Sequence, residues 1–143
     1  MSFDLKIQSG NLVLNNGDLQ QVVDSEKLEQ DILKICLTDV GSNPLNPWYG
    51  SFLSRSIIGS AESTTILVQI GQSQLNTCLQ NLQSLQQQQV KTFQRVSADE
   101  QLAVIKNISV TRNAIDPRLF VVKISGLTKG TKPISTAFSV SSI

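Results

Sequence analysis

Histidine is absent from the 143 residues of this chain, and the absence removes much of the chemistry that proteins use. Histidine is the commonest general base near neutral pH and the commonest metal ligand. Ser-His and Cys-His nucleophile systems are therefore excluded. The two cysteines, Cys36 and Cys78, lie far apart and form no CxxC motif, and neither a P-loop nor a GxGxxG motif is present. We expect no catalytic, metal-binding or cofactor-binding residue.

Charged residues are also few. They make up 16% of the chain, against about a quarter in typical soluble domains. The twelve basic residues are scattered and the net charge is +1, so no nucleic-acid-binding face is expected. Glutamine, asparagine, serine and threonine take the place of charge. A polar but weakly charged surface is poorly protected against association. This composition favours a protein packed against other proteins, with an ordinary low-charge monomer as the alternative.

Long apolar runs are missing too, so no membrane span is expected. The opening MSFDLKIQSG has no apolar core of a signal peptide, so we expect no secretion signal. Cys36 and Cys78 fall on apolar stripes of predicted helices. This favours reduced, buried thiols in a protein made in the cytosol over a disulfide between them. The length fits one domain, 1–143.

The first 23 residues have the pattern of short β-strands. Residues 3–7 alternate apolar and polar, and NLVL and LQQVV follow after turns. Asn16-Gly17 is a strong signal for a tight hairpin. A small antiparallel sheet is predicted here.

Helical spacing of apolar residues then begins. A helix is predicted over 25–38, with Asp24 or Ser25 as its N-cap, and a second over 51–58. A third starts at Ser60 or Ser63 and runs for about 25 residues, or ~37 Å at 1.5 Å per residue. One face of this long helix is apolar, and the other is rich in glutamine, which is either solvated or in contact with a partner.

The last third returns to strands. Ser97–Glu100 has the S-x-x-E form of a capping box. Alternating segments follow at 103–110, 118–126 and 132–141, the last two joined by a turn around Lys129-Gly130. The predicted fold class is α+β, with N-terminal antiparallel strands, central helices including one long helix, and a C-terminal antiparallel hairpin sheet.

A carboxylate pair, as in glycoside hydrolysis, is the enzymatic alternative that survives. Most of the eleven acidic residues stand at turns, caps or first helical turns, where structure explains them. Trp48 and Tyr49 could line a sugar site, but no acid lies within about six residues of them. We therefore expect a protein that is not an enzyme and keep a glycosidase as the alternative.

One stretch resembles a known family. GDLQQVVDSEKLEQDILKICLTDVGSNPLNPWYGSFLSRSIIG, with Tyr49-Gly50-Ser51, Leu53 and Gly59 behind the first helix, is similar to the sheath initiators of contractile-tail baseplates. These baseplate wedge proteins, some labelled lysozyme-like, occur in bacteriophages and related injection systems. The resemblance covers nearly the whole chain. At the family's Glu-Pro-Arg position this chain has Glu100-Gln101-Leu102, so a role of that arginine in wedge contacts does not carry over.

The resemblance implies structural work. It implies a fold like the inner domain of the sheath subunit and a place in the virion tail baseplate, assembled in the cytoplasm of the host bacterium. Six copies would surround the tail axis. The partners would be the tail sheath protein and other wedge proteins, with tail tube or hub proteins as further candidates. Its C-terminal strands would join arms of the sheath in a shared sheet and template the first sheath ring.

Two sets of interaction residues follow. The sheath contact is expected on the C-terminal strands, where β-branched faces with few charges leave an edge open for strand addition. Its residues are Leu119, Val121, Lys123, Ser125, Ile134, Thr136, Phe138 and Val140. The wedge contact is expected at Trp48, Tyr49 and Glu100. The alternative is that the strands cover the core and the rings pin a corner. Deleting 132–143 is expected to leave a folded protein that cannot assemble sheath.

Overall fold

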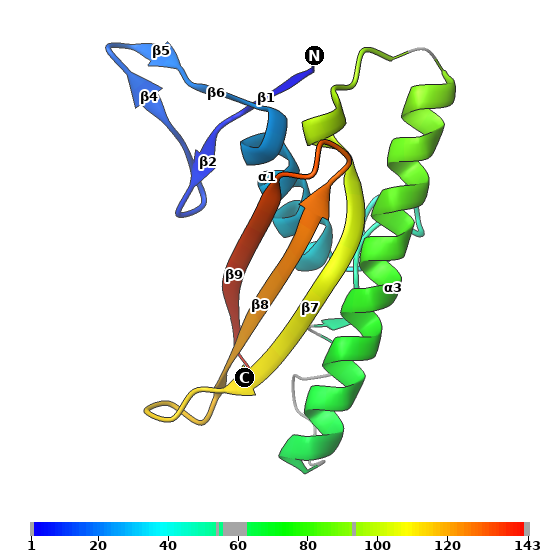
Figure 1. Ribbon diagram of the computed structural model, residues 1–143. Helices are drawn as coiled ribbons and strands as arrows, with labels where there is room; N and C mark the ends of the chain where they lie inside the picture. Colours follow the sequence, from blue (N-terminus) through cyan, green and yellow to red (C-terminus); the bar gives the residue numbers. More distant parts are fainter. Residues whose placement is uncertain (1, 54, 56–62, 93, 142–143) are drawn as a thin grey trace.

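The structure is a computed structural model, and it describes residues 2–53, 55, 63–92 and 94–141 (Figure 1). Its elements are β1 (Phe3–Leu5), β2 (Ile7–Gln8), β3 (Asn11–Leu12), β4 (Leu14–Asn15), β5 (Asp18–Leu19), β6 (Gln21–Val23), α1 (Asp24–Leu37), α3 (Thr64–Lys91), the 3₁₀ helix η1 (Ala98–Glu100), β7 (Leu102–Arg112), β8 (Leu119–Thr128) and β9 (Pro133–Ser141). The predicted α+β class is confirmed: antiparallel strand pairs come first, helices follow, and a three-stranded antiparallel sheet closes the chain.

The first 23 residues form three two-stranded ribbons, β1–β6, β2–β3 and β4–β5, that meet at one point. At that point the N–H of Lys6 donates to the carbonyl of Gln20 at 2.8 Å, Val13 to Lys6 at 3.1 Å, and Gln20 to Val13 at 3.0 Å. The strands pair antiparallel as predicted. However, the three-way junction interrupts the run 3–7 at Lys6, so the ribbons diverge instead of forming one sheet (Figure 1).

Two-residue turns close the outer ribbons. Ser9 and Gly10 have φ values of 52° and 79°, and Asn16 and Gly17 have 52° and 88°. Positive φ at both central positions belongs to the type I′ turn, which matches the twist of paired strands. The predicted Asn16-Gly17 hairpin is therefore confirmed.

The C-terminal sheet has the order β7-β8-β9, and its three strands confirm the predicted ones. β8 pairs with β9 without a break, from Leu119↔Ser141 to Leu127↔Pro133. β7 pairs with β8 through register shifts near Leu102 and Ile105. The connection between β8 and β9 contains the predicted turn, closed by the N–H of Thr131 donating to the carbonyl of Thr128 at 2.9 Å.

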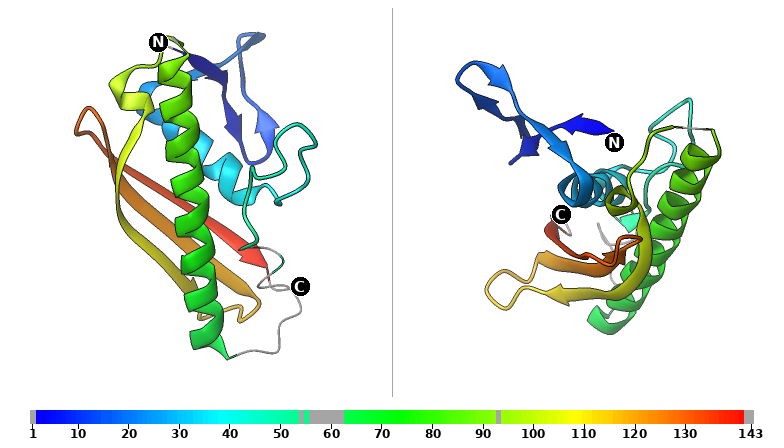
Figure 2. Two further views of the ribbon diagram at one scale, coloured as in Figure 1. Left: turned by 90° about the vertical axis from the view of Figure 1, so that its right-hand side faces the viewer. Right: turned by 45° about the horizontal axis from the view of Figure 1, so that its top comes forward.

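Both helices cover the same face of this sheet (Figure 2). α3 lies along β7, α1 lies beside β9, and the two helices also touch each other. The core contains the apolar stripes that predicted the helices. Its residues are Leu28, Ile32, Ile35 and Cys36 on α1, Leu53 in the segment between the helices, Leu67, Leu75, Cys78, Leu79 and Leu82 on α3, and Leu102, Val110, Phe120, Val122, Ile124, Ile134 and Val140 on the sheet. Removal of these side chains from water drives the layers together.

The two helices start differently. Ser63 is the N-cap of α3, and its hydroxyl accepts the N–H of Ile66. Of the two predicted starts of this helix, Ser60 and Ser63, the second is confirmed. For α1 the predicted cap was wrong. Val23 occupies the N-cap position and makes no side-chain cap bond, while Asp24 has φ 52° and accepts the hydroxyl of Ser97 at 2.8 Å. The carboxylate holds a distant corner instead of its own helix.

Two further predictions concern single segments. Cys36 and Cys78 are free and buried, as expected. Of the helix predicted over 51–58, Leu53 is buried in the core, while 54 and 56–58 lie outside the described residues.

Candidate protein-interaction site

The three-stranded sheet has two edge strands, β7 and β9, and each exposes a row of backbone groups to whatever lies beside it. Helix α3 lies beside β7 and helix α1 lies beside β9 (Figure 1). The side chains that these helices offer are different, and the two edges are therefore covered to different extents.

Glutamine amides from α3 cover the edge of β7. Gln72 donates to the carbonyl of Ile108 at 3.2 Å, and Gln83 donates to the carbonyl of Ala103 at 3.1 Å. Gln86 is buried; it accepts the N–H of Leu102 at 2.9 Å and donates to the carbonyl of Glu100 at 3.0 Å. These amides satisfy backbone groups that another strand would need. These three glutamines of the polar face thus bond the sheet within the chain.

The edge of β9 is more open. The N–H of Ser135 donates to the carboxylate of Glu29 at 3.4 Å, a long bond at an exposed position. Along a strand, successive residues direct their backbone groups to opposite sides, so Ala137 and Ser139 direct theirs to the same side as Ser135. In the described residues, Glu29 is the side chain from α1 that bonds this edge.

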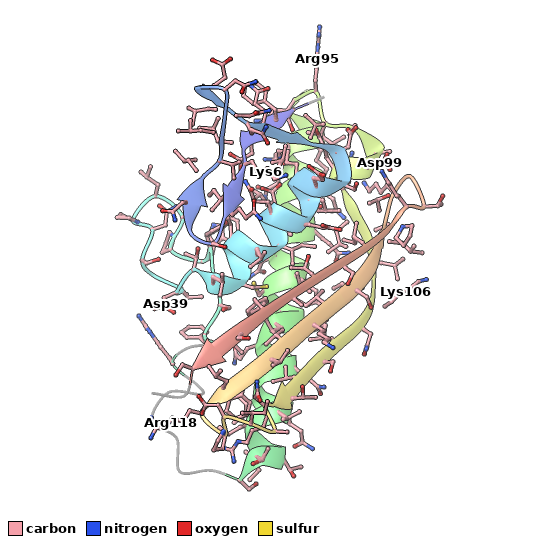
Figure 3. All side chains as sticks on the ribbon, turned by 90° about the vertical axis from the view of Figure 1, so that its left-hand side faces the viewer. Lys6, Asp39, Arg95, Asp99, Lys106 and Arg118 are labelled. Carbon is pink, nitrogen blue, oxygen red and sulfur yellow. The ribbon has the colours of Figure 1, made fainter. Side chains whose placement is uncertain are left out.

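A groove follows this edge. It has a volume of about 360 Å³ and lies between β9, α1 and the segment where β1 gives way to β2. Figure 3 shows β9 and α1 running side by side, with Lys6 on the neighbouring ribbon. The described lining residues are Lys6, Ile7, Val22, Glu26, Glu29, Gln30, Leu33, Ser135, Thr136 and Ala137.

The residues predicted for the sheath contact divide between two faces. On β8, Leu119, Val121, Lys123 and Ser125 alternate with buried residues and lie on the face away from the helices. On β9 the predicted residues have side chains that face the core, so the backbone edge of this strand is what they leave to a partner. Ile134, Thr136 and Val140 are buried and Phe138 packs against the core.

The outward residues of β9 are its alternates, Ser135, Ala137 and Ser139. The sequence carried this signal, because the large apolar side chains of β9 occupy one parity and small side chains the other. The apolar parity is the one that a core buries.

The predicted wedge residues Trp48 and Tyr49 sit on a pinned corner. The ring centroids are 6.2 Å apart in an edge-to-face arrangement at 68°. Trp48 is 40% exposed, whereas Tyr49 packs against the core. Ser51 fixes the corner to the end of α1, because its N–H donates to the carbonyl of Thr38 at 2.8 Å and its hydroxyl to that of Cys36 at 2.6 Å. Only Trp48 of the pair offers a large free surface.

Glu100, the third predicted wedge residue, is 1% exposed. Its carboxylate accepts the N–H of Ser2 at 2.9 Å, the hydroxyl of Ser2 at 3.0 Å and the N–H of Ser97 at 3.0 Å. The last bond completes the predicted capping box, which is confirmed. A direct contact between this carboxylate and a partner is therefore not available in the folded chain. Glu100 instead ties the start of the chain to the corner before β7.

An ion network lies on the opposite side of α1 from the groove glutamates. Lys34 pairs with Asp4 and, at 3.2 Å, with Asp31, which also pairs with Lys27 at 2.7 Å. Burial disfavours the ionised form of Asp4, but the hydrogen bond and charge of Lys34 and the bond from Gln30 outweigh it, so the pKa of Asp4 is lowered. Burial likewise opposes the charge on Lys34, yet Asp4 and Asp31 raise its pKa.

Tyr49 lines a second cavity of about 280 Å³ beside this network, together with Phe3 and Gln89. Burial raises the pKa of the Tyr49 hydroxyl above its ordinary value. In the core nearby, a hydrogen bond with Cys78 and burial raise the pKa of the Cys36 thiol. A thiol held protonated in this way is a poor nucleophile.

Glu26 and Glu29 are two acids that share the groove beside β9. No aromatic side chain is among the described residues that line it. Within residues 2–53, 55, 63–92 and 94–141, no three Cys, Asp or Glu side chains gather as metal ligands would. Neither α1 nor α3, the helices of this part of the chain, has the length and apolarity of a membrane-spanning helix.

Comparison with known proteins identifies the fold. No protein-family model matches the sequence, and no curated protein matches it either. Among solved structures, the chain is similar to a Geobacter sulfurreducens protein named "putative tail lysozyme", with a TM-score of 0.59 and 10% identity. The match covers 92% of this chain and 96% of that one. The two chains share a fold over nearly their whole lengths.

Proposed function

We propose that this chain is a structural component of a contractile tail, located in the baseplate, that binds the tail sheath by strand addition at β9 and so starts the first sheath ring. Two independent indications agree on the tail. The sequence resembles the sheath-initiator family, and the fold is similar to that of a protein whose name places it in a tail. The fold alone does not carry a function. The proposal therefore rests on the site.

The difference between the two sheet edges is the observation that carries the proposal. Side-chain amides of α3 occupy part of the edge of β7. Within the described residues, α1 bonds the edge of β9 through the long bond from Ser135 to Glu29, and Ala137 and Ser139 lie farther along that edge. Edge strands of monomeric proteins are usually protected against pairing with another chain. An edge left accessible beside a groove suits strand addition, in which backbone bonds supply affinity.

The second proposed contact, with another wedge protein, uses the Trp48 corner. Leu45 is 89% exposed and Phe52 44% exposed in the same loop region as Trp48. Large exposed apolar side chains on a rigid loop are typical anchors of interfaces. Glu100 does not take part in this contact directly, and its role is to hold Ser2 and Ser97 in the folded chain. The family resemblance implies six copies around the tail axis. Each copy would contact the wedge through the Trp48 corner and the sheath through β9.

A proline substitution at the edge tests strand addition. Ala137→Pro removes a backbone N–H that faces the groove while leaving the bonds between β8 and β9, and proline is tolerated at edge positions. Ala137→Ser keeps the N–H and is the matched control. We expect the serine variant to seed sheath assembly with the cognate sheath protein, as seen by electron microscopy, and the proline variant to fail while remaining folded by circular dichroism. Equal seeding by both would overturn the proposal.

Truncation after Lys132 is not a suitable test, contrary to the expectation from sequence. It would remove β9, whose Ile134 and Val140 are part of the core. Loss of assembly by that variant would report unfolding.

The alternative function is a glycosidase that uses Glu26 and Glu29. The observation that favours it is the presence of both carboxylates in one groove. Release of soluble fragments from peptidoglycan by the intact chain, lost in Glu26→Gln and Glu29→Gln, would support the enzyme. Absence of release by the intact chain would leave the groove to a protein partner.

A further inference from the structure

We propose that the groove beside β9 selects an extended segment carrying a basic side chain, which Glu26 and Glu29 receive. The inference rests on the proposed function, because it describes the chemistry of the segment that β9 would pair with. The partner is thus a strand-forming arm that places a lysine or arginine on the face turned toward α1.

The distribution of ion pairs around α1 is the first observation. Lys27 and Lys34, on the side facing β1, are engaged by Asp31 and Asp4. Glu26 and Glu29 make no ion pair in the part of the chain that the structure describes. Within the described residues, the charges on one side of the helix are therefore paired, whereas the two carboxylates on the groove side have no ion pair.

The charge balance of the groove is the second observation. Its described lining contains the two carboxylates and one ammonium group, that of Lys6. A strand added to β9 would cover part of the groove and exclude water from it. Carboxylates that lose water need a compensating charge or hydrogen bond, and a nearby cation becomes more favourable as the surroundings become less polar. A neutral or acidic segment would leave this cost uncompensated.

The hydrogen bond between Glu29 and Ser135 is the third observation. The N–H of Ser135 is a donor that an added strand would use, and the Glu29 carboxylate occupies it at 3.4 Å. A bond this long is easily displaced. When the strand takes over the Ser135 donor, the carboxylate loses its partner and a basic side chain on the strand replaces it.

The spacing along α1 defines the segment further. Glu29 and Leu33 both line the groove, one helical turn apart. Four residues of helix span ~6 Å, and two residues of strand span ~6.7 Å. Helix α1 and strand β9 run in the same direction (Figure 3). If a basic residue of the added strand reaches Glu29, the residue two positions away in that strand therefore lies beside Leu33. The segment should therefore combine a basic and an apolar residue at positions i and i+2.

Binding of the cognate sheath protein to immobilised full chain tests the inference. The double variant Glu26→Gln/Glu29→Gln keeps size and hydrogen-bonding groups, and Asp18→Asn/Asp39→Asn removes the same charge elsewhere. We expect the first to weaken binding about tenfold or more and to flatten its salt dependence, and the second to change it less than about twofold.

The outcomes separate the inference from the function on which it rests. Loss of binding in Ala137→Pro with unchanged or tighter binding in the glutamine variant would keep strand addition and overturn the basic-segment inference. Unchanged binding in Ala137→Pro, or no binding by the intact chain, would overturn both. Recovery of binding by Glu29→Lys with a sheath arm whose basic residue is changed to glutamate would confirm the charge pairing directly.

Discussion

The side chain of Gln86 forms hydrogen bonds with the backbone of Glu100 and Leu102. Its carbonyl oxygen accepts the N–H of Leu102 at 2.9 Å, and its NH₂ group donates to the backbone carbonyl of Glu100 at 3.0 Å. The residue is 5% exposed although it belongs to the glutamine-rich face of a long helix. It closes the first residues of β7 against any other strand. Together with Gln72 and Gln83, it makes the edge of β7 less accessible than that of β9 in the part of the chain that the structure describes.

Replacing Gln86 with leucine should destabilise the fold. The change leaves the N–H of Leu102 and the carbonyl of Glu100 buried without partners, at a cost of about 1–3 kcal/mol per group. Gln87→Leu, at the exposed neighbouring position, should change the free energy of unfolding by less than about 0.5 kcal/mol. Urea denaturation of the two variants measures the difference. Equal stabilities would mean that the buried amide bonds contribute nothing net.

Glu100→Ala should loosen the start of the chain. The carboxylate holds the N–H and hydroxyl of Ser2 and the N–H of Ser97, and bonds to a charged acceptor contribute about 1.5–3 kcal/mol each. We expect a loss of about 3 kcal/mol and faster amide exchange in β1. Glu26→Ala is the exposed control. Exchange in β1 that is as slow as in the unchanged chain would contradict the role assigned to Glu100.

The ion pair of Asp4 with Lys34 should make stability depend on pH in acid. The folded-state pKa of Asp4 is lowered below its ordinary value of 3.8. Its contribution is therefore fully present above pH 3.8 and is lost as the pH falls through the lower folded-state pKa.

Asp4→Asn should accordingly be less stable than the unchanged chain at pH 6, and the difference should shrink below pH 3.8. Asp18→Asn, in an exposed hairpin, is the matched control for loss of one carboxylate. Urea midpoints measured from pH 2 to pH 7 give the comparison. A difference that stays constant over this range would show that the pair does not stabilise the fold.

Gly50→Ala should disturb the Trp48 corner. Gly50 has φ 123°, and a Cβ there would stand 2.5 Å from the carbonyl oxygen of Thr38. Gly41 also has a positive φ, 86°, but has open space around it. Alanine at Gly41 should therefore cost about 1–2 kcal/mol from backbone strain, and alanine at Gly50 clearly more. Trp48 is the single tryptophan, so its fluorescence reports the corner. Equal effects at the two glycines would contradict the close contact.

Local patterns predicted most of the fold because they were strong. The Asn16-Gly17 turn, the Ser63 cap, the capping box at Ser97 and the three C-terminal strands each depend on neighbours in sequence, and the structure has them. The three-way junction at Lys6, Val13 and Gln20 depends on bonds between segments that no local pattern encodes.

The site was harder to predict, for a related reason. Phe138 and Val140 were predicted for the sheath contact because strands with few charges can leave an edge open, but their side chains belong to the parity that the core takes. Glu100 was expected to contact a wedge protein because it stands at the Glu-Pro-Arg position of the resemblance, but its partners at Ser2 and Ser97 keep it buried. Which strand of the sheet remains open could not be read from sequence at all, since Gln72 and Gln86 reach β7 only in the folded chain.

Amide hydrogen exchange of the chain bound to its cognate sheath protein tests the central claim most directly. The account predicts that the amides of Ala137 and Ser139 become protected on binding, while those of β7 keep the exchange rates of the free chain. Unchanged exchange at Ala137 and Ser139, or new protection along β7 instead, would contradict it.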